Sequence, residues 1–139
     1  LRKLMMSYID AVLFANEAFY VSFASGDADA MDELWSSKAP VSCIHPGWES
    51  LSGREDVLDS WRSIIRGGAP AIRCREPEVF LYGDTATVLC YEEVEGGFLI
   101  ATNVFIREAA AWKMVHHQAG PTRGKPQDDP ANEKKPEMN

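Results

Sequence analysis

Histidine and glutamate side chains at three places in the sequence are suited to moving protons. His45 lies in the segment His45-Pro46-Gly47-Trp48, Glu93 precedes a pair of glycines, and His117 lies close to the last apolar residues. An imidazole titrates near neutral pH, and a carboxyl group removed from water has its pKa raised toward that range. His45 or His117, together with Glu93, could therefore act as general acid and base on a bound molecule.

Each of these residues also has a purely structural interpretation. His117 could be hydrogen-bonded to a neighbour or lie at a dimer interface. His45 could belong to a plain turn in which Trp48 fills a gap, or to a mobile loop where binding residues gather. Glu92 and Glu93 could be solvated charges at the end of a hairpin. The sequence leaves these alternatives open.

Other kinds of chemistry lack their sequence signatures. His45, His117 and Glu93 do not have the spacing that marks a metal site, so we expect no bound metal. Neither a nucleophile paired with its base nor a phosphate-binding glycine loop occurs in the sequence. We therefore expect a protein that works without a cofactor.

The composition is that of one small acidic domain. The 139 residues are 45% hydrophobic, which is enough for one core and too few for two domains. The net charge is −7 and no Lys/Arg cluster interleaves with aromatic residues, so we expect no nucleic-acid partner. No apolar run is long enough to cross a bilayer or act as a signal peptide, so we expect a cytoplasmic protein without a membrane partner. Cys43, Cys74 and Cys90 are odd in number and widely spaced, which indicates reduced thiols.

Apolar residues recur at helical spacing in three segments of the first half of the chain. The first runs from Tyr8 to Ser25, and Gly26 ends it. Asp27 caps the second, which stops near Ser36. The third begins with the capping box Ser52-Gly53-Arg54-Glu55 and ends at Gly67. A short strand, residues 41–45, lies between the second and third helices.

The second half of the chain has the two-residue period of β-strands. Four strands are predicted: Ile72 to Tyr82, Thr85 to Val94, Phe98 to Arg107, and Trp112 to Ala119. Short loops between them favour antiparallel neighbours. We predict an α+β fold, a curved antiparallel sheet with three N-terminal helices packed across one face, forming a cone-shaped pocket. Residues 1–7 are expected to be a poorly ordered start, residues 8–120 the domain, and residues 121–139 a disordered tail.

Three short motifs, in this order and spacing, resemble the nuclear transport factor 2-like (SnoaL-like) superfamily. They are Ser25-Gly26-Asp27 with Trp35 downstream, the segment Gly53 to Val57, and Trp112-Lys113-Met114-Val115-His116. The resemblance implies a cystatin-like cone with a pocket between helices and sheet, and a homodimer formed through the outer sheet face. The superfamily includes isomerases, dehydratases, epoxide hydrolases, polyketide cyclases, a kinase association domain and binding modules, so it implies no single activity.

The resemblance also implies which face of the last strand lines the pocket. That strand is similar to one in the kinase association domain, in which the parity of Val115 faces the cavity and the parity of Trp112 faces the partner subunit. His117 is then inside, while Trp112, Met114 and His116 form an outward row, although a bulge would invert this assignment.

Alternation along the other strands extends the predicted pocket. It places Tyr91 and Glu93 on one face of the second long strand, and Asn103 on one face of the third. With His117, and with His45 and Trp48 from the turn, these side chains could converge on one ligand, although Tyr91 could equally be a core aromatic.

Two functions remain open from the sequence. In the first, this SnoaL-like domain binds a small molecule and is a cofactor-independent isomerase, dehydratase or cyclase that uses proton transfer. In the second, it is a non-catalytic binding or assembly module on the same fold. We also expect a homodimer, because the long apolar strands and the outward row would expose a large apolar patch in a monomer.

Overall fold

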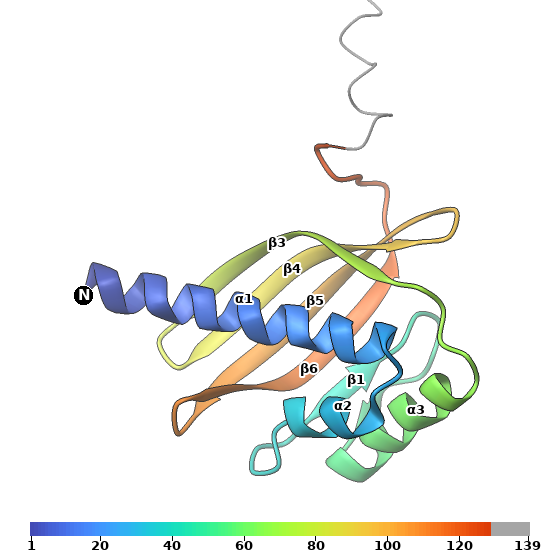
Figure 1. The fold of residues 1–139 in the computed structure, drawn as a ribbon, viewed down its shortest axis with the longest axis horizontal. Coiled ribbons are helices and arrows are strands. Elements are labelled where there is room, and N and C mark those ends of the chain that lie inside the picture. Colours follow the sequence, from blue (N-terminus) through green and yellow to red (C-terminus); the bar gives the residue numbers. More distant parts are fainter. Residues whose placement is uncertain (129–139) are drawn as a thin grey trace, which may run out of the picture.

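Helices lie on one face of the sheet and leave the other face open (Figure 1). A computed structural model describes residues 1–128. Its helices are α1 (Arg2–Ala24), α2 (Ala28–Leu34) and α3 (Arg54–Arg66). Its strands are β1 (Ser42–Ile44), β2 (Leu51–Ser52), β3 (Arg73–Tyr82), β4 (Thr85–Val94), β5 (Gly97–Glu108) and β6 (Ala111–Pro121). The predicted α+β fold is confirmed. Among residues 1–128, no helix has both the length and the apolar content that a membrane crossing needs.

The long helix α1 packs along the inner face of the sheet. Val12, Phe19 and Phe23 are buried and recur at helical spacing, as the sequence indicates. The helix begins at Arg2, so the prediction of a poorly ordered start over residues 1–7 is wrong. At the other end Gly26 adopts a positive φ of 69°, which lets the chain turn at once into α2.

The start of α3 is predicted correctly, but its capping box is not formed. The N-cap is Gly53, with φ 93° and no side-chain cap. Ser52 instead pairs with Ser42 in the β1–β2 ladder, and the Gly53 N–H donates to the Val41 carbonyl at 2.9 Å. Ser52 is held in the sheet, so its hydroxyl does not cap the helix.

Arg54, the first residue of α3, joins α3 to the end of α2. Its guanidinium donates hydrogen bonds to the backbone carbonyls of Asp32 (2.9 Å), Trp35 (2.7 Å) and Ser36 (3.0 Å). Carbonyl groups at the end of a helix lack partners within the helix, and a cation is favourable there. A single side chain therefore closes α2 and fixes its position against α3.

The sheet has the strand order β2-β1-β6-β5-β4-β3. Strands β3 to β6 form the predicted antiparallel meander. Strand β1, however, pairs with β6 in parallel, with Cys43 opposite His117. The sheet is therefore mixed, where the sequence predicted an antiparallel one. This pairing places the turn after β1 at the end of the sheet where His117 lies.

A bulge in β6 reverses part of the predicted parity. Val104 pairs with His116 and Phe105 with Met114, so Val115 is an extra residue in the strand. Met114 is fully buried, and Trp112 is 6% exposed and packs against the Tyr8 ring of α1 at 5.6 Å. The predicted outward row is therefore wrong for Trp112 and Met114. Beyond the bulge, His117 faces inward and is 2% exposed.

The predicted parity of β4 is also wrong. Ala86, Val88, Cys90 and Glu92 are the buried residues of this strand. Tyr91 and Glu93 alternate with them on the outer face, where Glu93 forms an ion pair with Arg75 at 2.8 Å. Both faces of β4 carry apolar side chains, so alternation alone does not reveal which face the helices cover.

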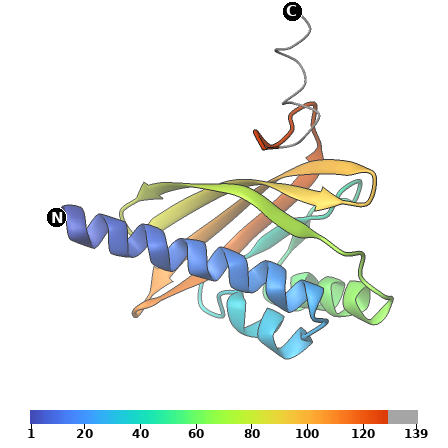
Figure 2. The same cartoon turned by 45° about the horizontal axis from the view of Figure 1, so that its top comes forward.

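The segment after β6 returns to the sheet (Figure 2). Pro121 ends β6 opposite Leu99, so a tail beginning at residue 121 is incorrect. Gly124 lies against the Tyr91 ring, and Gln127 N–H donates to Glu76 Oε2 at 2.7 Å. Asp128 forms an ion pair with Arg75. The rest of the predicted tail, residues 129–139, lies outside the described residues.

Candidate functional site

A cavity of about 350 Å³ lies between α1, α3 and the inner face of the sheet. Its wall is mainly apolar, and the polar side chains are few. The residues that line it include Tyr20, His45, Trp48, Trp61, Glu92 and His117. A cavity of this size and composition is suited to a small molecule that is held by apolar contact and oriented by a few polar groups.

Asn103 fixes the proton position on His117. The Nδ1 atom of His117 lies 2.5 Å from Asn103 Oδ1, which can only accept a hydrogen bond. His117 therefore carries its proton on Nδ1, and its Nε2 atom has a free lone pair. Asn103 is itself held, because its Nδ2 donates to Asn16 Oδ1 at 2.9 Å and to the Tyr20 hydroxyl at 3.1 Å.

Glu92 lies beside the free nitrogen of His117. Its Oε2 accepts a hydrogen bond from the Tyr20 hydroxyl at 2.7 Å and lies 3.9 Å from His117 Nε2. Glu92 is 3% exposed, so a charge on it is poorly solvated. One buried network thus joins Asn103, Tyr20, Glu92 and His117 at the cavity wall.

Burial sets the protonation states in this network. It lowers the pKa of His117 to about 3, with smaller contributions from His45 and His116. Burial raises the pKa of Glu92, although the Tyr20 hydrogen bond opposes the change. His117 is therefore neutral at pH 7, and the carboxyl of Glu92 keeps its proton to a higher pH than an exposed glutamate. A neutral imidazole and a carboxyl group with a raised pKa thus lie side by side.

His45 is the second imidazole of the cavity wall. The Ser60 hydroxyl donates to the Val57 carbonyl at 2.7 Å, so its oxygen accepts from His45 Nε2 at 2.9 Å. His45 Nδ1 then has no proton. The ring packs in edge contacts with Trp48 and Trp61, each with centroids 4.6 Å away. Burial lowers the pKa of His45 to about 4.

Four of the six predicted site residues gather at the cavity. His45, Trp48 and His117 line it, and Asn103 lies behind His117. Trp48 is 49% exposed and lies at the mouth. The other two predicted residues, Tyr91 and Glu93, point to the opposite face of the sheet. Their predicted convergence on the ligand is wrong, because the parity of β4 is reversed.

Sequence reasoning missed Glu92 and Tyr20. Glu92 follows from the correct parity of β4, which sets it opposite Leu99 of β5. Tyr20 and Asn16 carried a signal, since they are polar residues one turn apart on a helix that is otherwise mostly apolar there. Polar groups on a buried helix face need buried partners, and here the partners are Asn103 and Glu92.

Charge and ligand chemistry restrict what the cavity can hold. No Lys or Arg is among the residues that line it. No group of three or more His, Cys, Asp or Glu side chains within residues 1–128 is arranged to hold a metal ion. A carboxylate or phosphate in the cavity would face Glu92 and Glu95 without a cationic partner. The wall therefore disfavours an anionic ligand.

The family profile of the SnoaL-like domain matches residues 12–122 of the chain. The matched range extends from within α1 to the end of β6, so it contains every residue of the cavity wall.

Solved structures agree with this assignment. A protein from Streptomyces avermitilis, provisionally named a dehydratase of the nuclear transport factor 2-like family, is 33% identical with a TM-score of 0.77, over 85% of this chain and 98% of that one. A protein from Thiobacillus denitrificans, provisionally named a calcium/calmodulin-dependent protein kinase type II association domain, is 32% identical with a TM-score of 0.68, over 78% and 93%. A protein from Novosphingobium aromaticivorans, 21% identical with a TM-score of 0.69, shares the cystatin-like fold.

A curated relative places a similar domain in a longer chain. The F-box protein SKIP8 of Arabidopsis thaliana is 29% identical over 112 residues, which is 78% of this chain. The match spans only 48% of the length of that relative.

Proposed function

Since the chain belongs to the family of SnoaL-like domains, we propose that its cavity binds an uncharged, mainly apolar small molecule and transfers a proton on it without a cofactor. The observation that carries this proposal is the pair formed by His117 Nε2 and Glu92 Oε2, 3.9 Å apart in the cavity wall. Asn103 holds the imidazole in the tautomer that leaves Nε2 free. A base and an acid so placed can serve one substrate without moving.

Dehydration of a β-hydroxy ketone uses both groups. His117 Nε2 takes the proton from the carbon between the carbonyl and the carbinol carbon. The hydroxyl leaves as water with the proton of Glu92, and a carbon–carbon double bond forms. The proton held by His117 then returns to Glu92, so the site is restored with no other reactant. Isomerisation of an enone uses the same pair, with the proton returned to a different carbon.

The cavity wall supports this role in two further ways. Apolar and aromatic side chains exclude water, which strengthens electrostatic interactions inside the cavity. His45 Nδ1 has no proton and can accept a hydrogen bond from a substrate hydroxyl. The 33% identity to a protein provisionally named a dehydratase supports dehydration over the other proton transfers.

A simple uncharged substrate tests the proposal. The β-hydroxy ketone formed from benzaldehyde and acetone loses water to give benzalacetone, which is followed by its ultraviolet absorbance. Deuterium uptake at its carbon acid in D₂O, followed by NMR, reports proton removal separately. We expect the protein to accelerate at least the exchange, because the probe is uncharged and fits the apolar wall.

Matched variants on the two faces of the sheet provide the controls. His117→Gln and Glu92→Gln should each lower the rate by about 100-fold or more, as expected for loss of a general acid or base. His116→Gln and Glu93→Gln change the neighbouring residues on the outer face and should leave the rate within about twofold of the native rate. Equal loss in both sets, or no loss in either, would contradict the assignment.

A binding module is the second candidate function. The relative in Arabidopsis thaliana is an F-box protein in which the matching part spans about half the length, so a domain of this kind occurs inside a larger protein. In this alternative the cavity binds its ligand without changing it. Binding of the β-hydroxy ketone without proton exchange, together with weakened binding in Trp48→Ala, would favour this function.

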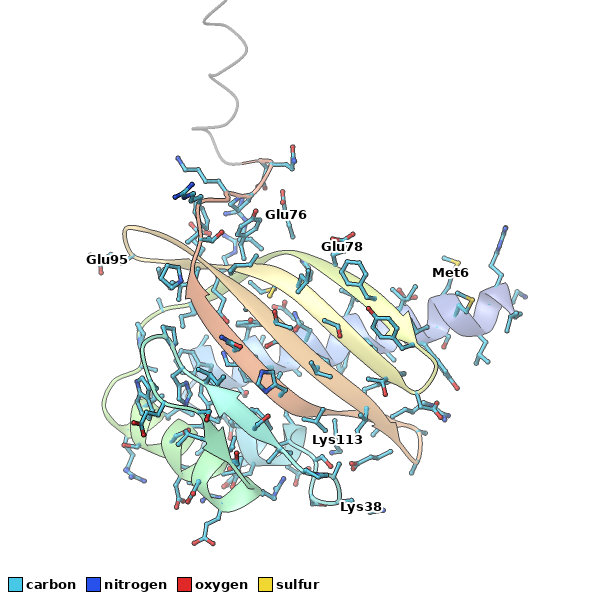
Figure 3. The ribbon with its side chains drawn as sticks, turned by 180° about the vertical axis from the view of Figure 1, so that it is seen from behind. Met6, Lys38, Glu76, Glu78, Glu95 and Lys113 are labelled. Atoms are coloured by element: carbon cyan, nitrogen blue, oxygen red, sulfur yellow. The ribbon has the colours of Figure 1, made fainter. Side chains whose placement is uncertain are left out.

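A homodimer through the outer sheet face is the proposed assembly. Figure 3 shows the sheet from the side opposite α1, where no helix covers it. Phe80 and Tyr82 are 36% and 64% exposed on β3, and Val104 and Ile106 share that face on β5. Thr85 and Thr87 of β4 lie between these two pairs. Exposed apolar side chains gathered on one face are typical of an interface. The free cysteines support a reducing, cytosolic location.

A further inference from the structure

Two cysteines lie behind the polar network, on neighbouring strands. Cys74 of β3 pairs with Glu92 of β4, and Cys90 lies two residues before Glu92. Residues two apart on a strand share a face, so Cys90 points inward beside Cys74. Cys90 is 1% exposed and Cys74 is half-buried. Both are free thiols.

The strands can bring the two sulfur atoms together. Diagonal neighbours on one face of an antiparallel pair have Cα atoms about 7–8 Å apart, whereas disulfides have Cα separations of about 4.4–6.8 Å. A small approach of β3 to β4 is therefore required. The register of β3 shifts between Arg75 and Glu78, opposite Cys90, and Glu76 there has a positive φ of 52°. Ladder hydrogen bonds are interrupted at a bulge, so fewer of them oppose this approach.

The two thiols influence each other's titration. Cys90 is the main cause that raises the pKa of Cys74, and Cys74 is the main cause that lowers the pKa of Cys90. Cys43, by contrast, is fully buried on β1, and burial raises the pKa of its thiol to about 12. Reactivity toward oxidants requires thiolate character. Cys43 also lies on β1, which β6 and β5 separate from β4 and β3, so it has neither of the other two thiols as a neighbour.

Each thiol contacts a residue that holds the network in place. Asn16 Nδ2 lies 3.5 Å from Cys74 Sγ, and the Tyr20 hydroxyl lies 3.3 Å from Cys90 Sγ. These two α1 side chains both accept hydrogen bonds from Asn103 Nδ2. Tyr20 also donates to Glu92. A change in the position of either sulfur would therefore alter the hydrogen bonds of Asn16 and Tyr20, which orient His117 and Glu92.

We propose that Cys74 and Cys90 are a redox-sensitive pair, which hydrogen peroxide converts to a disulfide, and that this bond alters the hydrogen bonds behind His117 and Glu92. Peroxide transfers one oxygen to the first sulfur, giving a sulfenic acid and one water. The second thiol attacks that sulfur, forms the S–S bond and releases the oxygen as a second water. Two thiols lose two electrons and two protons, and one peroxide is reduced. The proposal holds whether or not the cavity is catalytic.

Mass spectrometry tests the bond in the full chain. The protein is treated with hydrogen peroxide, unfolded and alkylated. We expect one alkylated cysteine after treatment and three before it. Trypsin should then release the dipeptide Cys74-Arg75 linked to the fragment 76–107. Cys43→Ser should still form the bond, whereas Cys74→Ser and Cys90→Ser should not. Three alkylated cysteines in the treated protein, or a bond that includes Cys43, would overturn the proposal.

Side-chain ¹⁵N NMR of the histidines tests the coupling to the network. Oxidation should shift the imidazole signals of His117 in the native protein. In the Cys74→Ser variant, the same treatment should leave the His117 signals unchanged. Reduction with dithiothreitol should restore the original spectrum. A bond that forms without any change at His117 would refute the coupling. Neither experiment uses activity, so failure of the proposed reaction does not affect the outcome.

Discussion

Polar side chains in the cavity wall have partners that are themselves polar and buried. Asn103 connects His117 to Asn16 and Tyr20, and Tyr20 connects this group to Glu92. A buried polar group without a partner costs about 1–3 kcal/mol, so the network also determines which conformation of the core is stable. Burial is the main cause that keeps His117 neutral. The functional protonation states are therefore a property of the folded state alone.

Acid should unfold the protein through its two buried imidazoles. The ordinary histidine pKa is 6.5, whereas the folded values are about 4 for His45 and about 3 for His117. Below pH 6.5 the unfolded chain binds protons that the folded chain does not, so stability falls as the pH drops toward 4. Glu92 has the opposite sign, since its raised pKa costs stability as the pH rises above 4.5. Urea unfolding between pH 7 and pH 5 should show the loss.

The double variant H45Q/H117Q separates these contributions. It removes both imidazoles and keeps side chains that can donate and accept hydrogen bonds, so most of the decrease between pH 7 and pH 5 should vanish. An unchanged decrease would show that the two rings are protonated in the folded protein, and that the acid-sensitive groups lie elsewhere.

At the scale of elements, the turn after β1 presents one tryptophan to the cavity mouth while α3 supplies another to the core. Pro46 and Gly47, with φ 81° at the glycine, make a tight turn in which Trp48 N–H donates to the His45 carbonyl at 2.9 Å. Trp61 is 5% exposed and packs edge to face on Phe19 at 5.2 Å. The two rings should therefore differ in what they contribute to stability.

Replacement of each tryptophan by alanine tests this difference. Trp48→Ala should cost less than about 1.5 kcal/mol of unfolding free energy, because half of the ring is exposed. Trp61→Ala should cost about 3–5 kcal/mol, as for other buried large residues. Urea titration measures both. Trp48→Ala should also weaken binding of the uncharged fluorophore N-phenyl-1-naphthylamine. A large loss of stability in Trp48→Ala would place this ring in the core and remove it from the binding site.

The hydrogen bonds from Arg54 to the end of α2 should also contribute to stability. Arg54→Ala leaves the carbonyls of Asp32, Trp35 and Ser36 without their donor and should cost about 2–3 kcal/mol, because charged hydrogen bonds are strong. Arg62→Ala is the control: it removes partly exposed ion pairs with Asp32 at 2.5 Å and Asp59 at 3.0 Å, and should cost less than about 1 kcal/mol. Thermal unfolding compares them. Equal effects would mean that Arg54 does not close α2.

The sequence predicts the positions of the helices and strands well. It predicts less well which face of each strand points toward the helices. The helical and two-residue periods locate α1, α3 and the four long strands to within a few residues at most ends, because local spacing determines them. The parity of β4 requires knowledge of which face α1 covers, since Val88 and Leu89 make both faces apolar. The Val115 bulge in β6 arises from pairing with β5 and leaves no local signal. The predicted inward placement of His117 agrees with its burial, whereas Glu93 lies on the outer face of the sheet.

At the scale of the whole molecule, the chain after β6 becomes part of the fold. Residues 122–128 cover part of β3 and β4 on the outer face, where Arg75 is paired with both Glu93 and Asp128. A Cβ atom at Gly124 would lie 2.5 Å from the Tyr91 hydroxyl oxygen, so the backbone approaches this ring closely. The sequence predicts that residues 121–139 are a disordered tail, whose removal would leave stability unchanged. In the structure, residues 121–128 contact the sheet, so their removal is expected to lower stability.

Truncation distinguishes these two expectations. A chain ending at Gly120 should melt several degrees lower than the full chain, because it loses the contacts of residues 121–128 with Tyr91, Glu76 and Arg75. A chain ending at Asp128 keeps those contacts and should melt within about one degree of the full chain. Differential scanning calorimetry makes the comparison. Equal melting temperatures for all three chains would show that the docked segment contributes nothing to stability.

Assembly is the last expectation, and it depends on the face that the helices leave open. The outer face presents Val104 on β5 in register with Thr87 of β4 and Phe80 of β3, so a row with two apolar side chains crosses the sheet. Light scattering at micromolar concentration should give twice the 15.5 kDa mass of the chain. Val104→Asp places a charge in the row and should give the monomer mass. Phe14→Asp is the matched control, since Phe14 is 78% exposed on α1, on the opposite side, and this variant should remain a dimer. A native monomer, or dissociation by Phe14→Asp alone, would exclude the outer face as the interface.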